Sequence, residues 1–470
     1  VEHAGLARRL TLAELGVNLR SFLAVALLEP MMGIQHISNV RWLAEFWSWP
    51  AARREAWRRA RLYETLAIAA RDVPFYRRLL SRGVLGDDPF EALHQLPSVD
   101  KATIREREEE FLSVRRESIP AIPKRTGGST GEPWQYALDK RAWSHMYAAQ
   151  LHFFERAGVR YGERMLTLGV PVMPGTTAAT LRGRLRRRFE NRVAASSSFE
   201  VDDRASLARA REAVSVRAAL WYGYAGTIAA MADAVLTSGV ALPGPRAIVT
   251  MAEPLQPAWR ERIELAFGAP VFDEYGCNDG GVLAQSCAAG RFHLAENLSI
   301  VEILDGDRVC EPGEEGDVAI TNLHARVLPF IRYRNADRAE LGDGPCPCGQ
   351  PGETLLRVLG RTGDRVELPD GTSLSVMTFA QVFKRTPGVR RWQVVQKSSG
   401  DLVVRLDVRD DFTNDEQRLI VDYVVERTRD QVRVRTTTTE PIDRTPAGKH
   451  KVVVRERAVG SGAGGGRVWS

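Results

Sequence analysis

Apolar positions recur at helical spacing through the first hundred residues. Residues 50–73 carry this spacing with arginines between the apolar positions, and Pro74 then ends the helical pattern before another one begins. We therefore predict that residues 1–100 are largely helical. We interpret the aromatic residues of this region as core residues; they are Trp42, Trp47, Trp49 and Trp57.

From about residue 160, short strand patterns alternate with helical patterns. The strand patterns lie at 164–172, 192–198, 218–224, 246–255 and 270–276, and the helical ones at 202–214, 227–239 and 257–268. Such alternation predicts parallel strands joined by crossover helices, in a layered α/β sheet. Ligands of open sheets bind at the carboxyl ends of the strands, where this chain has "MAEP" (251–254) and "DEYGCNDGG" (273–281).

After about residue 295 the pattern changes to strands separated by turns, including one predicted at 327–334. The last ninety residues read as strands, one helix and a further strand, which predicts a small α+β domain. We predict a large N-terminal domain over 1–359, a hinge over 360–371, a small C-terminal domain over 372–458 and a flexible tail over 459–470. No internal repeat is apparent.

Composition and charge narrow the class of protein. The chain has 470 residues, 44% hydrophobic and 26% charged, with a net charge of +6. Its 65 bases are interspersed with 59 acids, which favours an arginine-rich solvated surface over a nucleic-acid site. The densest basic run, at 181–192, has little aromatic interleaving, so we expect no nucleic-acid partner.

The cysteines and the apolar runs indicate the cellular compartment of the protein. Five sparse cysteines argue against a secreted disulfide framework. The longest N-terminal apolar run, at 22–28, is too short to span a bilayer and lacks the layout of a signal peptide. We expect a cytoplasmic protein without a transmembrane segment. The oligomeric state is not set by the sequence, and a homodimer is one option.

"TGGSTG" at 126–131 has the composition of an anion-binding loop. Its glycines let the backbone approach a ligand closely, and its N–H and hydroxyl groups can surround phosphate oxygens. It is not a Walker A loop, because Glu132 stands where that motif has lysine. A plain surface turn is the alternative.

Two further stretches combine an acid with groups that suit a nucleotide. In "FDEYGCNDGG", Tyr275 offers a ring for a purine and Asp279 a carboxylate for Mg²⁺. In "RYRNADRAEL", Asp337 is expected to end a strand-and-turn element and could bind ribose hydroxyls. Taken singly, the alternatives are an ordinary βα turn and a surface aspartate paired with Arg334 or Arg338.

"DRTPAGKHK" at 443–451 places Lys449 on a loop near the C-terminus. A flexible lysine can neutralise the charge that develops on phosphate in a transition state. The alternative is an ordinary surface lysine.

These motifs, in this order, resemble those of the adenylate-forming superfamily of acyl-CoA ligases and adenylation domains. The closest resemblance is to its phenylacetate–CoA ligase-like branch, including the capsule-biosynthesis type. It covers about residues 60–457 and includes "VPFYRRLL" (73–80) and "AEPLQPAWRERIELAFGAPVFDEYG" (252–276).

The resemblance implies a two-step reaction. A carboxylate attacks the α-phosphate of ATP, giving acyl-AMP and pyrophosphate; the small domain then rotates about the hinge, and the thiol of CoA attacks the acyl carbon. The alternatives are transfer to an amine or to a carrier-protein thiol, and a nucleotide-binding protein without turnover. The sequence does not identify the acid, although the aromatic rings of residues 221–226 hint at an aryl acid.

The resemblance also implies residue roles. Asp279 would bind Mg²⁺, although the family usually has glutamate there, so its carboxylate is one methylene shorter. The remaining roles are phosphate binding by Thr126, Gly127, Gly128, Ser129, Thr130 and Gly131; adenine and ribose binding by Glu253, Pro254, Tyr275 and Asp337; an acyl pocket of Tyr222, Ala252 and Gly276; a hinge at Arg361 and Asp364; and catalysis by Lys449 and Arg361.

Cys287, His293, Cys346 and Cys348 form a separate set. Thiolates and an imidazole in tight turns suit tetrahedral Zn²⁺, and four protein ligands would make the site structural. The set looks like that of zinc-bearing members of this branch; scattered free thiols are the alternative. Cys277 and Cys310 fall outside it.

Overall fold

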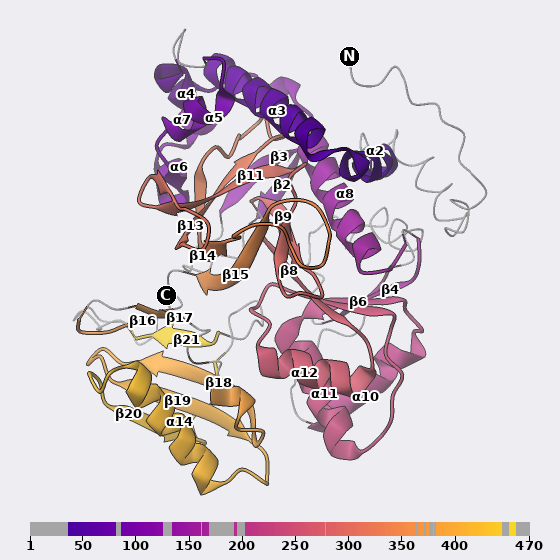
Figure 1. The fold of residues 1–470 in the computed structure, drawn as a ribbon, viewed down its shortest axis with the longest axis vertical. Helices are drawn as coiled ribbons and strands as arrows, with labels where there is room; N and C mark the ends of the chain where they lie inside the picture. Colours follow the sequence, from indigo (N-terminus) through magenta and orange to yellow (C-terminus); the bar gives the residue numbers. More distant parts are fainter. Residues whose placement is uncertain are drawn as a thin grey trace.

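The computed structural model contains one large mixed sheet and a smaller C-terminal sheet (Figure 1). This architecture confirms the predicted α/β class. In the described part of the chain, no helix has both the length and the apolar character needed to cross a membrane. The structure describes residues 36–80, 86–125, 134–160, 162–168, 192–194, 203–277, 279–361, 365–370, 373–375, 379, 382–443 and 451–456.

The described N-terminal residues are largely helical, as their periodicity predicts. Pro50 and Pro74 delimit the longest helix, because proline fits the first turn of a helix but not its interior. The four predicted core tryptophans pack, partly buried, against one hydrophobic cluster. The helices are α2 (His36–Ser48), α3 (Ala51–Asp72), α4 (Pro74–Leu79), α5 (Pro89–His94), α6 (Lys101–Glu106), α7 (Glu108–Phe111) and the 3-10 turn η2 (Arg116–Ser118).

Half of the large sheet is parallel, as predicted. Its strands run in the order β8-β7-β6-β4-β5. Three helices cover one face of these strands and share one apolar cluster. Helix α8 (Lys140–Arg156) packs on the other face over a second cluster (Figure 1). The strands are β4 (Met165–Leu168), β5 (Arg192–Ala194), β6 (Leu220–Tyr224), β7 (Ala247–Met251) and β8 (Val271–Cys277), and the helices are α10 (Asp203–Ser215), α11 (Ala225–Ser238) and α12 (Pro257–Phe267).

The other half of the large sheet is antiparallel, in the order β12-β11-β13-β14-β15-β10-β9, and β9 pairs with β8. Two-residue β1 (Val99–Asp100) adds to β14 in parallel. A separate hairpin joins β2 (Ala121–Arg125) to β3 (Gln135–Asp139). The remaining strands are β9 (Gly281–Ser286), β10 (Phe292–Leu294), β11 (Ser299–Asp305), β12 (Arg308–Val309), β13 (Glu315–Asn322), β14 (Tyr333–Leu341) and β15 (Thr354–Arg361).

Two local predictions were wrong. The predicted strand at 327–334 begins only at Tyr333, since Arg332 before it has a positive φ of 48°. Asp337 consequently lies within β14 and does not end it. The segment after Tyr275 was weighed as a βα turn, but it leads into antiparallel β9. Both errors arise because the alternating α/β pattern stops at β8 and an antiparallel meander follows.

The C-terminal residues form a four-stranded sheet, β20-β19-β18-β21, covered by one helix. Thr413 and Glu416 start this helix with a reciprocal capping box. The predicted strands and helix are present, while the exact domain boundaries stay predictions. The elements are β16 (Arg365–Glu367), β17 (Ser373–Ser375), η4 (Val382–Lys384), β18 (Val389–Gln396), β19 (Leu402–Val408), α14 (Asn414–Arg427), β20 (Val434–Thr437) and β21 (Val453–Arg455).

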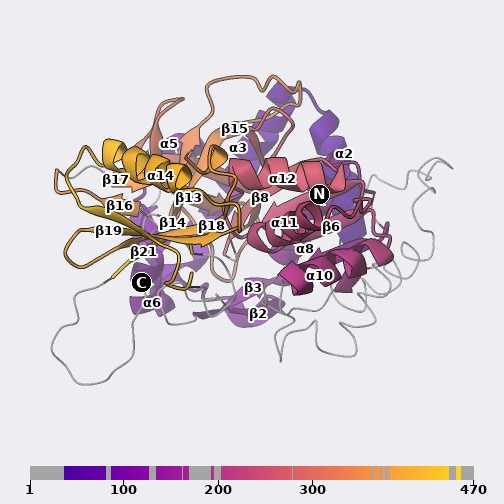
Figure 2. The same ribbon diagram turned by 90° about the horizontal axis from the view of Figure 1, so that it is seen from below.

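The C-terminal sheet lies beside α11 and α12 (Figure 2). Arg409 donates to the buried Asp233 of α11 at 2.8 Å. The buried indole of Trp392 donates to Gln256, which precedes α12, at 2.6 Å. These contacts fix one orientation of the small sheet against the parallel half of the large one.

Candidate nucleotide site and metal centre

Two of the predicted nucleotide-binding residues, Tyr275 of β8 and Asp337 of β14, are in contact in the folded chain. The hydroxyl of Tyr275 donates to Asp337 Oδ2 at 3.0 Å. Asn335 donates to the same carboxylate oxygen at 2.8 Å and to the Tyr275 hydroxyl at 3.0 Å. Burial raises the pKa of Tyr275, and the neighbouring Asp337 adds to the effect. The side chains thus form one connected polar group with a fixed geometry.

Arg361 joins this group from the end of β15. It faces Asp337 in the strand register, and its Nε lies 3.7 Å from Asp337 Oδ1. The predicted ribose acid and the predicted hinge arginine are therefore neighbours in the folded chain.

Asp279 is buried on the turn after β8. Tyr333 donates to its Oδ2 at 2.8 Å, and Tyr136 of β3 hydrogen-bonds the same carboxylate. Burial raises the pKa of Asp279, which Tyr333, Lys101 and Tyr136 oppose. Oδ1 is buried and has no hydrogen-bond partner among the described residues. A buried carboxylate oxygen without a hydrogen-bond partner fits a ligand of Mg²⁺, which binds through one or two carboxylates plus phosphates.

Lys101, Tyr136, Tyr333 and Asn335 belong to this site but were not singled out from the sequence. Lys101 carries a charge that interacts with both Asp279 and Arg361. It reaches them because β1, just before it, pairs with β14, with Val99 opposite Tyr333. A two-residue strand leaves no periodic signal, so only the pairing itself reveals this lysine.

Glu253 and Gly276 each support the backbone of a neighbouring segment. The buried carboxylate of Glu253 accepts from the N–H of Gly226 at 2.8 Å, which satisfies a donor in the first turn of α11. A Cβ at Gly276 would stand 2.6 Å from the carbonyl oxygen of Gly281. Glycine there permits the close approach of β8 and β9. Ala252, just before Glu253, has a positive φ of 65°, and Pro254, just after it, lies near Gly360.

Tyr222, predicted to line an acyl pocket, contacts β8 and α8. Its hydroxyl donates to Glu274 Oε1 at 2.7 Å, and Gln150 of α8 donates to the Tyr222 hydroxyl at 2.8 Å. Glu274 precedes Tyr275 in β8, so its side chain points to the opposite face of the sheet.

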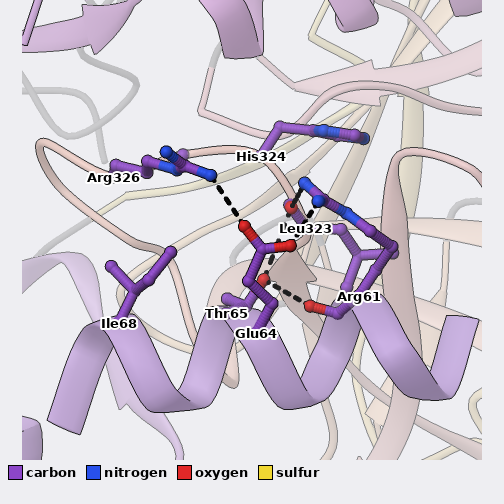
Figure 3. A pocket seen from close by; sticks show the side chains of 8 residues that line it. Arg61, Glu64, Thr65, Ile68, Leu323, His324 and Arg326 are labelled. Carbon is purple, nitrogen blue, oxygen red and sulfur yellow. Dashed lines mark hydrogen bonds and ion pairs between the residues drawn. The ribbon is translucent and has the colours of Figure 1, made fainter. Parts of the chain in front are cut away.

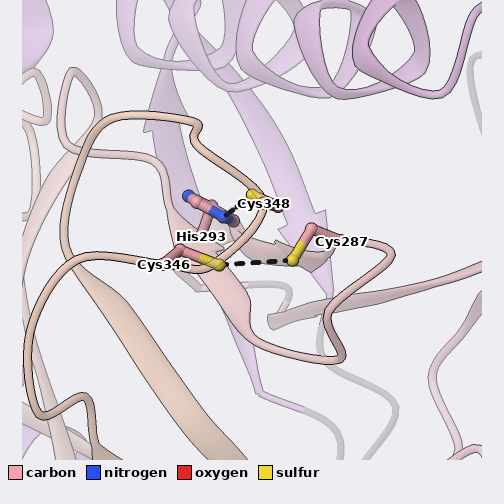
Figure 4. Close-up of side chains that lie close together, drawn as sticks. All are labelled: Cys287, His293, Cys346 and Cys348. Atoms are coloured by element: carbon pink, nitrogen blue, oxygen red, sulfur yellow. Dashed lines mark hydrogen bonds between the residues drawn. The ribbon is translucent and has the colours of Figure 1, made fainter.

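The predicted zinc ligands come together, as Figure 4 shows. Cys287 and Cys346 have their sulfurs 3.5 Å apart, and His293 Nε2 lies 3.2 Å from Cys348 Sγ. Usual Zn–S and Zn–N bond lengths in a tetrahedron give separations of about 3.8 and 3.6 Å, so a small expansion would admit the ion. Burial, followed by the charge of Arg156, lowers the pKa of His293 to about 4, which keeps the imidazole neutral and able to bind a metal.

Cys277 shows no sign of a nucleophile. Burial, followed by the charge of Asp279, raises the pKa of its thiol to about 12. Its sulfur accepts from the N–H of Gly280 at 3.1 Å. It packs beside the candidate site.

A small polar pocket lies between α3 and residues 323–326 (Figure 3). Glu64 bridges its two arginines, with 2.5 Å to Arg61 and 2.8 Å to Arg326. The lining contains none of the predicted site residues. Both arginines are already paired with Glu64, so we assign the pocket no ligand.

Several predicted site residues lie outside the described residues. They are the loop Thr126, Gly127, Gly128, Ser129, Thr130 and Gly131, the hinge residue Asp364, and Lys449. Their roles stay predictions.

Comparison with known proteins shows what the chain as a whole is similar to. Residues 366–456 match the family described as the CapK C-terminal domain. A phenylacetate–coenzyme A ligase of Thermus thermophilus is 24% identical over 412 residues, 80% of this chain and 86% of that protein. The protein CapK of Staphylococcus aureus is 22% identical over 347 residues, 72% of this chain and 74% of that protein.

These matches support the predicted resemblance to the phenylacetate–CoA ligase-like branch of the adenylate-forming superfamily. A solved structure shows a likeness at the level of the fold. A 2-hydroxyisobutyryl-CoA ligase, in a postadenylation state with its acyl-AMP bound, superposes with a TM-score of 0.68 at 18% identity. The match covers 87% of this chain and 90% of that one.

Proposed function

We propose that the protein activates a carboxylic acid with ATP as an acyl-adenylate and then transfers the acyl group to the thiol of CoA. The observation that carries this proposal is the assembly of Tyr275, Asp337 and Arg361 into one polar group, with Asp279 nearby. Relatives named phenylacetate–coenzyme A ligase support the class of reaction.

In the first step, a carboxylate oxygen of the acid attacks the α-phosphorus of ATP. The bond from this phosphorus to the bridging oxygen breaks, and pyrophosphate leaves. Tyr275 would lie against adenine, Asp337 would accept from the ribose hydroxyls, and the loop 126–131 would hold the phosphates. Lys449 and Arg361 would offset the charge that develops, so positioning and electrostatics supply most of the rate. In the second step, the CoA sulfur attacks the acyl carbon and AMP leaves.

Asp279 is the residue that would hold Mg²⁺. When bound, this ion neutralises phosphate charge during the displacement. The protein's contribution is a carboxylate whose Oδ2 is held by Tyr333 and whose Oδ1 stays available. Two fixed hydroxyls give a short side chain a defined position, which favours retention of the metal role despite the missing methylene.

We also propose that Zn²⁺ occupies the site of Cys287, His293, Cys346 and Cys348 as a structural ion. The support is the closeness of the four ligand atoms, all within 4.8 Å of one another. The ion would tie the β9–β10 connection to the turn at 346–348. Since none of the five cysteines is in a disulfide, a reducing, cytoplasmic setting suits the protein.

Pyrophosphate exchange into ATP tests the central proposal. Exchange should appear with at least one member of a broad panel of aryl and aliphatic acids. Lys449→Ala should abolish that exchange, whereas Lys397→Ala, which removes a lysine paired with Glu456 in the C-terminal unit, should retain it. The proposal fails if no acid supports exchange by a protein that is folded and binds ATP.

A further inference from the structure

Gln393 and Arg405 form a buried polar pair in the small C-terminal sheet. They lie opposite each other in the register of β18 and β19, and both side chains are almost fully buried. The next pair on the same face, Val395 and Val403, is apolar. Burial of an amide and a guanidinium is costly unless both are hydrogen-bonded, so the contacts of the pair indicate what it does there.

The amide of Gln393 binds the chain on both sides of residues 444–450. Its Nε2 donates to the backbone oxygen of Asp443 at 3.2 Å and to that of Lys451 at 2.7 Å. Its Oε1 accepts from the N–H of Asp443 at 3.4 Å and from Arg405 at 3.0 Å. These four contacts use both donors and both acceptor positions of the amide. One buried side chain therefore holds the two ends of this segment side by side.

Arg405 fixes the first of these ends through side chains as well. Its Nη1 donates to Asp443 Oδ2 at 2.8 Å, and its Nε donates to Glu440 Oε2 at 3.0 Å. Hydrogen bonds between charged groups are stronger than neutral ones, so the approach to Asp443 has a defined position. The second end continues into β21, which pairs in parallel with β18.

The segment between these ends carries Lys449, two positions before Lys451 in the sequence. Lysine places its charge at the end of a flexible stem, so its effect on a reacting phosphate depends on where the backbone holds that stem. Fixing both ends of a short segment removes many of the backbone conformations that it could otherwise adopt. Correct placement of a reacting group supplies much of an enzyme's rate.

We infer that Gln393 and Arg405 are positioning residues for Lys449, because they fix both ends of the segment that carries it. This inference rests on the proposed function and adds to it two residues that lie outside the sequence motifs. Both side chains act through the backbone at Asp443 and Lys451, and the lysine alone acts on the phosphate.

Two substitutions test this inference. Gln393→Met and Arg405→Met remove the hydrogen bonds and keep an unbranched side chain. Each variant is assayed with an acid that the wild type activates: pyrophosphate exchange reports the first step, and thioester formation from synthetic acyl-adenylate and CoA reports the second. The kcat of exchange should fall roughly ten- to a hundredfold with KM for ATP unchanged, because the lysine acts on charge that develops in the transition state. The second step should keep its rate.

Arg391→Met is the matched control. Arg391 joins the same two strands on the same face, with its Nε 2.7 Å from Asp407 Oδ2. Its loss removes an ion pair of the small sheet that lies away from Asp443 and Lys451 in the register, so both steps should keep their rates. Calorimetry on all three variants shows whether each one is folded.

A purely structural role of the pair would slow both steps together, and that result would overturn the inference. An unchanged rate of exchange in folded Gln393→Met would do the same, and Arg405→Met decides the question if the glutamine variant does not fold. Retention of exchange by Lys449→Ala would also overturn it, while leaving activation of the acid established. If the wild type activates no acid, the proposed function itself fails and this inference with it.

Discussion

Removal of the proposed zinc ion is the perturbation whose size the structure best defines. Cys287 and Cys346 are 59 positions apart in sequence, yet their sulfurs lie 3.5 Å apart. A metal that binds this preformed set and not the unfolded chain adds its binding free energy to folding. With free Zn²⁺ held at about 1,000 times Kd, the stabilisation is about 4 kcal/mol, which corresponds to a rise in Tm on the order of 8 °C.

The assay combines metal analysis with calorimetry. The purified chain should hold about one zinc ion, with X-ray absorption distances of about 2.3 Å to sulfur and about 2.0 Å to nitrogen. Chelation or Cys346→Ser should lower the Tm of the large unit and expose the remaining thiols to reagent. Cys310→Ser is the matched control, since Cys310 is also buried but lies outside the cluster.

A negative outcome is equally well defined. The reasoning is refuted if the protein binds Zn²⁺ no more tightly than the Cys346→Ser variant does. It is also refuted if bound zinc leaves the unfolding temperature unchanged, because a metal held by these four groups must stabilise the fold that brings them together.

Three other substitutions test separate parts of the structure. Asp233→Ala removes the 2.8 Å contact with Arg409 and should cost about 2–5 kcal/mol of coupling between the two sheets, seen as faster amide exchange in β18; unchanged exchange would contradict this. Burial raises the pKa of Asp273 to about 7, so the folded chain keeps a proton that the unfolded carboxyl releases near pH 4. The free energy of unfolding should therefore fall as pH rises from about 4 to about 7, and Asp273→Asn should flatten that profile in denaturant titrations. Tyr333→Phe removes a hydrogen bond to a buried carboxylate, worth about 1.5–3 kcal/mol, so calorimetry should show Mn²⁺–ATP binding weakened about 10- to 150-fold; an unchanged Kd would exclude Tyr333 from positioning Asp279.

The regular parts of the fold could be predicted because local patterns dictate them. Helical spacing and flanking prolines set α3, and Gly239 and Gly268, at φ of 66° and 61°, end α11 and α12 where the patterns end. Alternation of strands and helices predicted the parallel half of the sheet. The antiparallel half was harder to read, because short strands of a meander carry no helix between them to mark their direction.

Some residues of the candidate site could likewise be singled out from the sequence, and others could not. Tyr275, Asp337, Asp279 and the zinc ligands stand out because their residue types are chemically distinctive within short motifs. The sequence by itself therefore predicted the class of chemistry and proposed the residues that would perform it.

Only the tertiary structure decided which groups act on one another. Lys101 approaches Asp279 through a two-residue strand, and Gln150 reaches Glu274 across 124 positions of sequence. Such contacts depend on strand order and helix packing, which bring distant segments to one place without leaving a local pattern. The physical reason is that a hydrogen bond requires its atoms within about 3 Å, whereas sequence periodicity specifies only which face of an element a residue occupies.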